Sequence, residues 1–135
     1  MIVVDASLIV GWILLEPESA GTEALYDRIA REGAIGPVIF EIEVTNALRT
    51  NLRRGRISLH ERAEALDLLA RIGVATLPAS DQPPLADVIA MSDRHDITTY
   101  DASYVALAAR HMAPLATRDQ AMARAARAEG LIVLP

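Results

Sequence analysis

The chain has 135 residues, with 13 basic residues, 18 acidic residues and no cysteine. We expect one domain, residues 1–135, because a chain of this length buries about 65–70% of the surface that its unfolded form exposes. The absence of cysteine excludes disulfides, thiolate catalysis and cysteine-bound zinc. Every basic residue is an arginine, so mechanisms that need a lysine are also excluded, among them Schiff-base catalysis and phosphate binding by a P-loop.

The chain is expected to begin with a buried strand. Residues 2–4 are an uninterrupted apolar run, which is typical of strands that are covered on both faces of a parallel sheet. Asp5 stands where this strand ends, and in open parallel sheets the functional crevice lies at the carboxyl ends of the strands. A helix should follow and end near Glu16-Pro17, because proline cannot continue it.

The apolar segment of residues 8–15 is expected to be a helix of the core. It is too short to span a bilayer, and an acid precedes it where a signal peptide would carry basic residues. We therefore expect a cytoplasmic protein. Trp12, Leu14 and Leu15 are more than one helix face can bury, so this helix either contacts a second protein chain or is buried on all sides.

Helical patterns then alternate with short apolar runs. Such an order implies right-handed crossovers and a parallel sheet with helices on both faces, which is an α/β fold. The expected helices are residues 19–32, 38–54, 58–72 and 83–95, a segment from the turn at 97–103 to about residue 110, and residues 120–128. The expected further strands are residues 34–37, 73–77, 113–117 and 131–134.

Four acids stand at boundaries or flanks of these elements, on the side of the predicted crevice: Asp5, Glu43, Asp101 and Asp119. Glu43 and Asn46 lie three positions apart in the helix of residues 38–54, and we expect both on the flank of its buried stripe. The three aspartates each stand at the start of a helix, where Asp is a favoured N-cap worth about 1 kcal/mol. One reading is therefore a non-catalytic α/β binding module whose aspartates only cap helices.

The combination of acids favours a metal site. Mg²⁺ and Mn²⁺ prefer several carboxylate oxygens and water, and a cation of this kind both generates a nucleophile and stabilises charge in phosphodiester hydrolysis. Without a metal the cluster would repel itself. Two other acidic-pocket folds fit poorly. A haloacid-dehalogenase-type hydrolase needs a second Asp where Ser7 stands, and both this hydrolase and a receiver domain need a lysine.

Four segments together resemble the acidic motifs of PIN-domain ribonucleases, and most closely those of the VapC toxins of toxin–antitoxin pairs. The segments occur in the same order and at the same spacing as in that family. They are Val4-Asp5-Ala6-Ser7, Glu43-Val44-Thr45-Asn46-Ala47-Leu48-Arg49, Thr99-Tyr100-Asp101-Ala102-Ser103-Tyr104-Val105-Ala106-Leu107-Ala108 and Leu115-Ala116-Thr117-Arg118-Asp119.

This resemblance implies a three-layer α/β/α domain whose parallel sheet of about five strands has the order 3-2-1-4-5. It also implies an endoribonuclease that depends on Mg²⁺ or Mn²⁺, acts on RNA and forms a homodimer. A small antitoxin would be its partner, in a heterotetramer or a larger assembly.

The resemblance also implies roles for individual residues. Asp5, Glu43, Asp101 and Asp119 match the metal-site acids. Asn46 matches their polar companion, and Ser7 and Thr117 match the hydroxyls that support the site. By the family's mechanism, metal held by Asp5 and Asp101 activates water, while Glu43 and Asp119 complete or orient the shell.

A basic strip follows the second motif. Arg49, Arg53 and Arg56 are spaced by four and three positions, which predicts that they share one helix face. There they would contact an RNA backbone or an acidic part of the antitoxin. The alternative is that these arginines only stabilise the carboxyl end of a helix, where cations are favoured.

Overall fold

The computed structural model describes residues 1–14 and 22–134, and in these ranges short strands alternate with helices. None of the helices in the described ranges is long and apolar enough to cross a membrane. The strands are β1 (Ile2–Val4), β2 (Ala34–Gly36), β3 (Ala75–Thr76), β4 (Leu115–Ala116) and β5 (Val133–Leu134). The helices are α1 (Ala6–Ile13), α2 (Thr22–Glu32), α3 (Phe40–Arg53), α4 (Leu59–Ile72), α5 (Leu85–His95), α6 (Thr99–His111) and α7 (Gln120–Ala128), with a short 3₁₀ helix, η1 (Ala79–Asp81).

The strands form one parallel sheet with the order β3-β2-β1-β4-β5. This confirms the order 3-2-1-4-5 that the family resemblance implied. Val3, in the central strand, pairs with Ile35 on one side and with Leu115 on the other. Because parallel neighbours all end at the same edge, the residues that follow β1 and β4 are brought close together.

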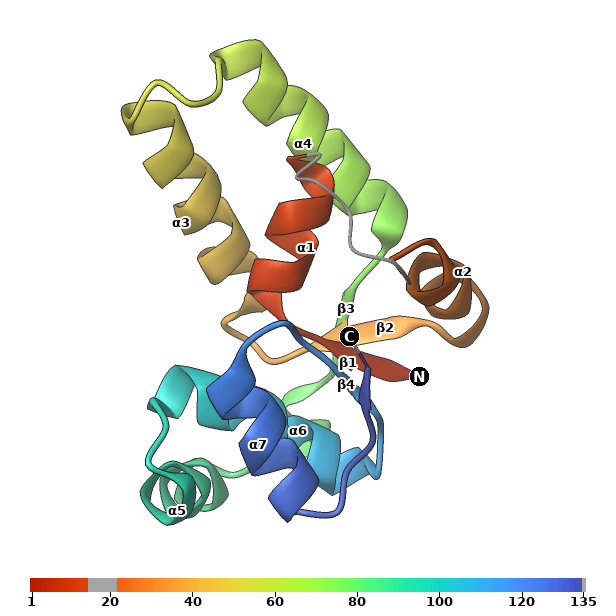
Figure 1. Cartoon of the computed structure of the whole chain (residues 1–135), viewed down its shortest axis with the longest axis vertical. Helices are drawn as coiled ribbons and strands as arrows, with labels where there is room; N and C mark the ends of the chain where they lie inside the picture. Colours follow the sequence, from red (N-terminus) through yellow and green to blue (C-terminus); the bar gives the residue numbers. More distant parts are fainter. Residues whose placement is uncertain (15–21, 135) are drawn as a thin grey trace.

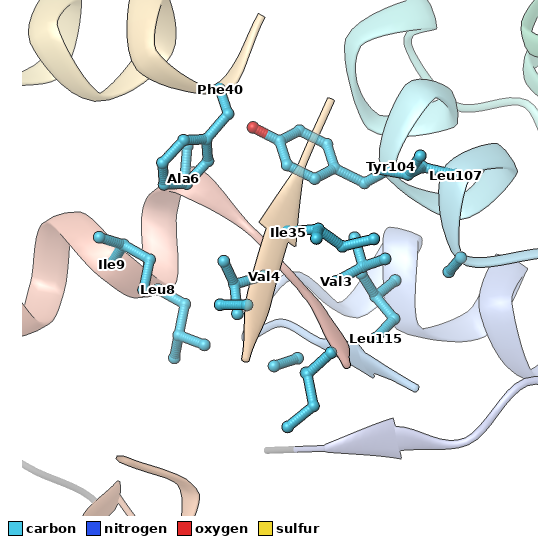
Figure 2. Close-up of a cluster of buried hydrophobic side chains, with 14 of the residues drawn as sticks. Val3, Val4, Ala6, Leu8, Ile9, Ile35, Phe40, Tyr104, Leu107 and Leu115 are labelled. Atoms are coloured by element: carbon cyan, nitrogen blue, oxygen red, sulfur yellow. The ribbon is translucent and has the colours of Figure 1, made fainter. Parts of the chain in front are cut away.

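Helices cover both faces of the sheet, α1 to α4 on one side and α5 to α7 on the other (Figure 1). The expected three-layer α/β/α architecture is therefore confirmed. The core is centred on β1, whose three residues have no exposed surface. Figure 2 shows Val3 and Val4 among buried side chains that come from α1 and α6, including Leu8 and Leu107. Burial of one such side chain contributes roughly 1.5–3 kcal/mol.

Helix α1 is buried on almost every side. Ser7 is its one exposed residue, and the helix contacts both α3 and α4. Trp12 is buried, and its ring forms a T-shaped pair with that of Tyr26 in α2 at a centroid distance of 5.9 Å. Leu14 is half-buried. Of the two alternatives for this helix, burial within the protein therefore fits the residues of α1 that the structure describes. Leu15, the predicted helix end at Glu16-Pro17 and the predicted helix start at residue 19 lie outside the described residues.

The connection from β2 to α3 depends on a glycine. A Cβ atom built on Gly36 would lie 2.7 Å from Cγ of Phe40, closer than real Cβ contacts. Phe40 is the first residue of α3 and is 1% exposed. With no side chain at Gly36, α3 begins directly over the end of β2, and this brings Glu43 to the carboxyl edge of the sheet.

Candidate active site

Asp5 is the deepest acid of the site. It directly follows β1, caps the N-terminus of α1 and is 5% exposed. Its Oδ1 accepts a hydrogen bond from the Ser7 backbone N–H (3.1 Å), and its Oδ2 accepts bonds from the hydroxyls of Ser7 and Thr117, the latter at 2.9 Å. Burial raises the pKa of Asp5 above its usual value, although these hydrogen bonds oppose the shift. The two hydroxyls predicted to support the site therefore both contact Asp5.

Glu43 reaches the site from the first turn of α3. It is half-buried, and its Oε2 accepts a hydrogen bond from the hydroxyl of Tyr104 in α6. Burial raises the pKa of Glu43, the Tyr104 bond opposes this shift, and the negative charges of Asp5 and Asp101 add to it. Two acids from distant parts of the sequence are therefore close enough to Glu43 to affect its ionisation.

Asp101 lies in the first turn of α6, and its side chain is half-buried. The alternative reading, in which Asp101 caps a helix, does not hold for this residue, because Thr98 is the N-cap of α6. The Thr98 hydroxyl accepts a bond from the Asp101 backbone N–H (3.1 Å) and donates to Oδ2 of Asp101 (2.8 Å). A capping role therefore does not account for the Asp101 carboxylate.

Asp119 caps the N-terminus of α7, as the pattern of a helix start predicted. Its Oδ1 accepts a bond from the Met122 backbone N–H at 2.7 Å, and its own N–H donates to the Thr117 hydroxyl at 3.0 Å. Thr117 thus bonds to both Asp5 and Asp119, and it fixes the turn after β4 next to the end of β1. The side chain of Asp119 is exposed, so it lies at the rim of the site.

All four acids line one cleft of about 450 Å³ at the carboxyl edge of the sheet. No basic residue is among the described residues that line this cleft. The remaining lining residues are Ala6, Ser7, Val10, Ala47 and Met122. The predicted meeting of the four acids is therefore present in the fold.

The chemistry of the cleft fits a divalent cation. Asp5 and Glu43 ionise against neighbouring negative charge, and a cation would relieve that repulsion. Glu43, Asp101 and Asp119 each use one carboxylate oxygen for a hydrogen bond, and the other oxygen has no such partner among the described residues. In the same residues, no group of three histidine, cysteine or acidic side chains is spaced to hold a metal ion. Four carboxylates that could serve as ligands therefore line the cleft, but their arrangement in this structure is not yet that of a bound cation.

Asn46 does not lie where the sequence analysis placed it. It is exposed and is not among the residues that line the cleft. At about 100° per residue, Asn46 lies about 160° around the axis of α3 from the buried Val44. Ala47 lies only about 60° from Val44, on the same side as Glu43, and lines the cleft instead. The expected position on the buried flank is therefore correct for Glu43 and wrong for Asn46.

The predicted arginine face is only partly present. Arg49 and Arg53 are exposed residues of α3. Arg56 lies beyond the end of this helix, because Arg54 is the C-cap and Gly55 has a φ of 66°. Spacing by three and four predicts a common face only within one helix. The prediction that Arg56 shares the face of the other two is wrong.

Two residues that bond to the acids were not assigned a role from the sequence, Tyr104 and Thr98. Tyr104 stands three positions after Asp101, so the helical period indicates that both face the same side. Thr98 precedes Asp101 by three positions, which is the spacing of an N-cap and its N3 residue. These two spacings could have drawn attention to Tyr104 and Thr98. They do not show that Tyr104 bonds to Glu43 in α3.

A comparison with known protein families extends the motif resemblance to nearly the whole chain. Residues 2–128 match the family described as PIN domain. The chain belongs to the PIN-domain family. This PIN domain is 31% identical over 122 residues to Ribonuclease VapC3 of Pyrobaculum aerophilum, a match that covers 90% of this chain and 92% of that protein. It is 33% identical over 123 residues to Ribonuclease VapC1 of Mycobacterium tuberculosis, covering 91% and 89%. The resemblance seen in the motifs is confirmed.

Solved structures show the same fold. The crystal structure of PAE2754 from Pyrobaculum aerophilum aligns with a TM-score of 0.73 at 25% identity, covering 98% of this PIN domain and 82% of that chain. The crystal structure of FitAcB from Neisseria gonorrhoeae aligns with a TM-score of 0.67 at 18% identity, covering 100% and 97%. At 18% identity, the alignment with FitAcB shows that the two proteins share a fold and nothing more.

Proposed function

We propose that this PIN domain is an endoribonuclease that uses Mg²⁺ or Mn²⁺ to hydrolyse phosphodiester bonds in RNA. The observation that carries the proposal is the single cleft lined by Asp5, Glu43, Asp101 and Asp119 without a basic side chain among the described residues. Two relatives that match about nine tenths of the chain are named ribonucleases, and this supports RNA as the substrate.

In this mechanism the four acids have different tasks. A bound divalent cation would supply an activated water molecule and would stabilise the charge that develops on the scissile phosphate. Asp5 and Asp101 would hold it, and Glu43 and Asp119 would complete or orient its shell. Ser7 and Thr117 fix the Asp5 carboxylate by hydrogen bonds, so its orientation is set before any ligand arrives.

A toxin role belongs to the same proposal. It is supported by the names of the VapC relatives and by the motif resemblance. The expected partner is a cognate antitoxin, with a homodimer of this protein and a heterotetramer or larger assembly with the antitoxin, in the cytoplasm. Arg49 and Arg53 are exposed on α3, where they are available to contact RNA or the antitoxin.

The capping reading has one observation in its favour, because Asp5 and Asp119 are indeed N-caps. It does not explain Glu43. This side chain is half-buried in the first turn of α3, next to two further negative charges, and it makes no capping hydrogen bond. A capping role does not explain why a carboxylate is buried beside other acids, where its charged form is disfavoured, so we favour the nuclease.

The proposal is tested by incubating a structured RNA with the unaltered protein and with Asp101→Asn, with Mn²⁺ or with a chelator. We expect cleavage that requires the metal and is at least 100-fold slower in the variant, since the loss of a charged ligand removes transition-state stabilisation. Asp67→Asn, an exposed acid of α4, is the matched control and should cleave normally. Equal metal-dependent cleavage by Asp101→Asn would overturn the assignment.

A further inference from the structure

Tyr104 is a core residue whose only polar side-chain atom is aimed at the candidate active site. The side chain is 1% exposed, and its ring lies among buried apolar side chains (Figure 2). In the same view the hydroxyl oxygen points towards Phe40, at the start of α3. The hydroxyl donates a hydrogen bond to Oε2 of Glu43, which is 61 positions away in the sequence.

This bond joins the two helix layers at the cleft. Glu43 comes from α3, on one side of the sheet, and Tyr104 comes from α6, on the other side (Figure 1). Tyr104 is also one helical turn after Asp101, so α6 supplies both an acid of the cleft and the donor that holds a second acid. The packing of α6 against β1 therefore sets the position of Glu43 relative to Asp101.

Glu43 needs such a constraint. A glutamate has three rotatable side-chain bonds, and its half-buried carboxylate faces two other acids. Repulsion from these acids favours rotamers that carry the carboxylate out into solvent. The Tyr104 hydroxyl opposes this movement by binding one oxygen, and it leaves Oε1 without a hydrogen-bond partner among the described residues.

We infer that Tyr104 is a positioning residue, which acts through Glu43 to hold one of its carboxylate oxygens towards the cation site of the cleft. This inference rests on the proposed function and deepens it. The simpler reading is that Tyr104 only packs the core and that its hydroxyl needs an acceptor for its own sake. The two readings differ in what the loss of the hydroxyl does to cation binding.

The first test measures Mn²⁺ affinity by calorimetry in the absence of RNA. Tyr104→Phe keeps the ring and removes only the hydroxyl, and we expect its Kd for Mn²⁺ to rise about tenfold or more, since groups that orient metal ligands have effects of this size. In cleavage assays kcat should fall while KM for RNA stays close to that of the unaltered protein. Tyr26→Phe is the matched control, because Tyr26 lies on α2 against Trp12, and it should bind Mn²⁺ normally.

The second test places Tyr104→Phe in a Glu43→Ala background. If Tyr104 acts through Glu43, its substitution should change the Mn²⁺ Kd of Glu43→Ala by less than twofold. The double variant should also melt at a higher temperature than Glu43→Ala in metal-free buffer, since it no longer contains a buried hydroxyl without its acceptor. The double variant therefore keeps the test decisive even if Tyr104→Phe alone folds poorly.

The outcomes separate the inference from the function on which it rests. If the unaltered protein binds Mn²⁺ and cleaves RNA, but Tyr104→Phe matches it in Kd and kcat, the positioning role is overturned and the nuclease stands. The same conclusion follows if Tyr104→Phe weakens Mn²⁺ binding equally with and without Glu43. If the unaltered protein neither binds Mn²⁺ nor cleaves RNA, the proposed function falls and the inference falls with it.

Discussion

Asp5 performs two tasks with one carboxylate. It caps α1 through the Ser7 backbone N–H, and it receives two further hydrogen bonds from the hydroxyls of Ser7 and Thr117. A cap at the protein surface gains stability from one such bond and keeps its charge in water. Asp5 is buried, and its pKa is raised in spite of these bonds. Capping alone does not require burial next to other acids. The buried position of Asp5 is therefore consistent with a second role in the candidate active site.

Glu43→Gln tests the electrostatic cost of the cleft. The pKa of Glu43 is raised from its usual 4.5 by burial, with contributions from Asp5 and Asp101. Above pH 4.5 the folded state then binds more protons than the unfolded state, so stability falls as the pH rises through the raised pKa. Gln still accepts the Tyr104 bond but carries no charge. In metal-free buffer at pH 7.5 we expect the variant to be more stable than the unaltered protein, because the amide has no charged form for burial to disfavour.

Urea unfolding of both proteins between pH 4 and pH 8 measures this difference, which should shrink towards zero at the acid end. Comparison with the unaltered protein is needed because Glu129 has a lowered pKa and contributes a slope of the opposite sign. Glu41→Gln is the matched control, since Glu41 is exposed in the first turn of the same helix. A difference that stays constant across the pH range would contradict the prediction.

At the scale of elements, the helices were more predictable than the strands. Helix α7 has the predicted bounds, and α5 ends at the predicted residue, because caps and apolar periods are local signals. Strands β3, β4 and β5 were predicted over residues 73–77, 113–117 and 131–134, but each has only two residues. A strand ends where its neighbour stops pairing, and two of these three, β3 and β5, have only one neighbour. That limit depends on partners that the local sequence does not show.

Gly36→Ala tests the junction between β2 and α3. The added methyl group would lie 2.7 Å from Phe40, which is almost completely buried and cannot move aside without loss of packing. We expect a destabilisation of about 1–3 kcal/mol, as for other overpacked cores. Chemical unfolding measures it, and cleavage should weaken as well because α3 carries Glu43.

A double variant identifies the cause. Phe40→Ala removes Cγ and Cδ2, two of the three atoms nearest to the added methyl group, so the two substitutions together should destabilise the protein less than the sum of their separate effects. Strict additivity would show that contact with Phe40 is not what makes a side chain at residue 36 unfavourable.

At the scale of the whole molecule, the cleft forms because the parallel sheet brings four distant segments to one edge. The acids at the ends of β1 and β4 were predictable from this rule. The Tyr104–Glu43 bond was not, because it depends on how α3 and α6 pack across the sheet. The exposed position of Asn46 does follow from the helical period relative to the buried Val44, and the prediction overlooked it. Sequence periodicity gives the face of a helix, and three-dimensional packing decides which neighbour that face meets.

Metal linkage tests the assembled cleft as a unit. If the four acids bind one cation, Mn²⁺ at 100 times its Kd should stabilise the fold by about 2.7 kcal/mol, because only the folded chain brings the acids together. For a chain of 135 residues this corresponds to a rise in Tm of about 10 °C. Differential scanning calorimetry with and without Mn²⁺ measures the rise, and Asp67→Asn should show it in full.

Asp5→Asn decides between the metal site and the capping module in the same experiment. Asn caps a helix about as well as Asp, and its one oxygen can still accept the bond from the Ser7 backbone N–H, but its NH₂ group cannot accept the bonds that the Ser7 and Thr117 hydroxyls donate to Oδ2 of Asp5. The variant also has no charge to lose to burial, which offsets the lost bonds, so the metal-free variant should remain folded. The Mn²⁺-dependent rise in Tm should disappear. A protein that used its aspartates only as caps would show no rise with either sequence, because it would have no cation to bind in the folded state.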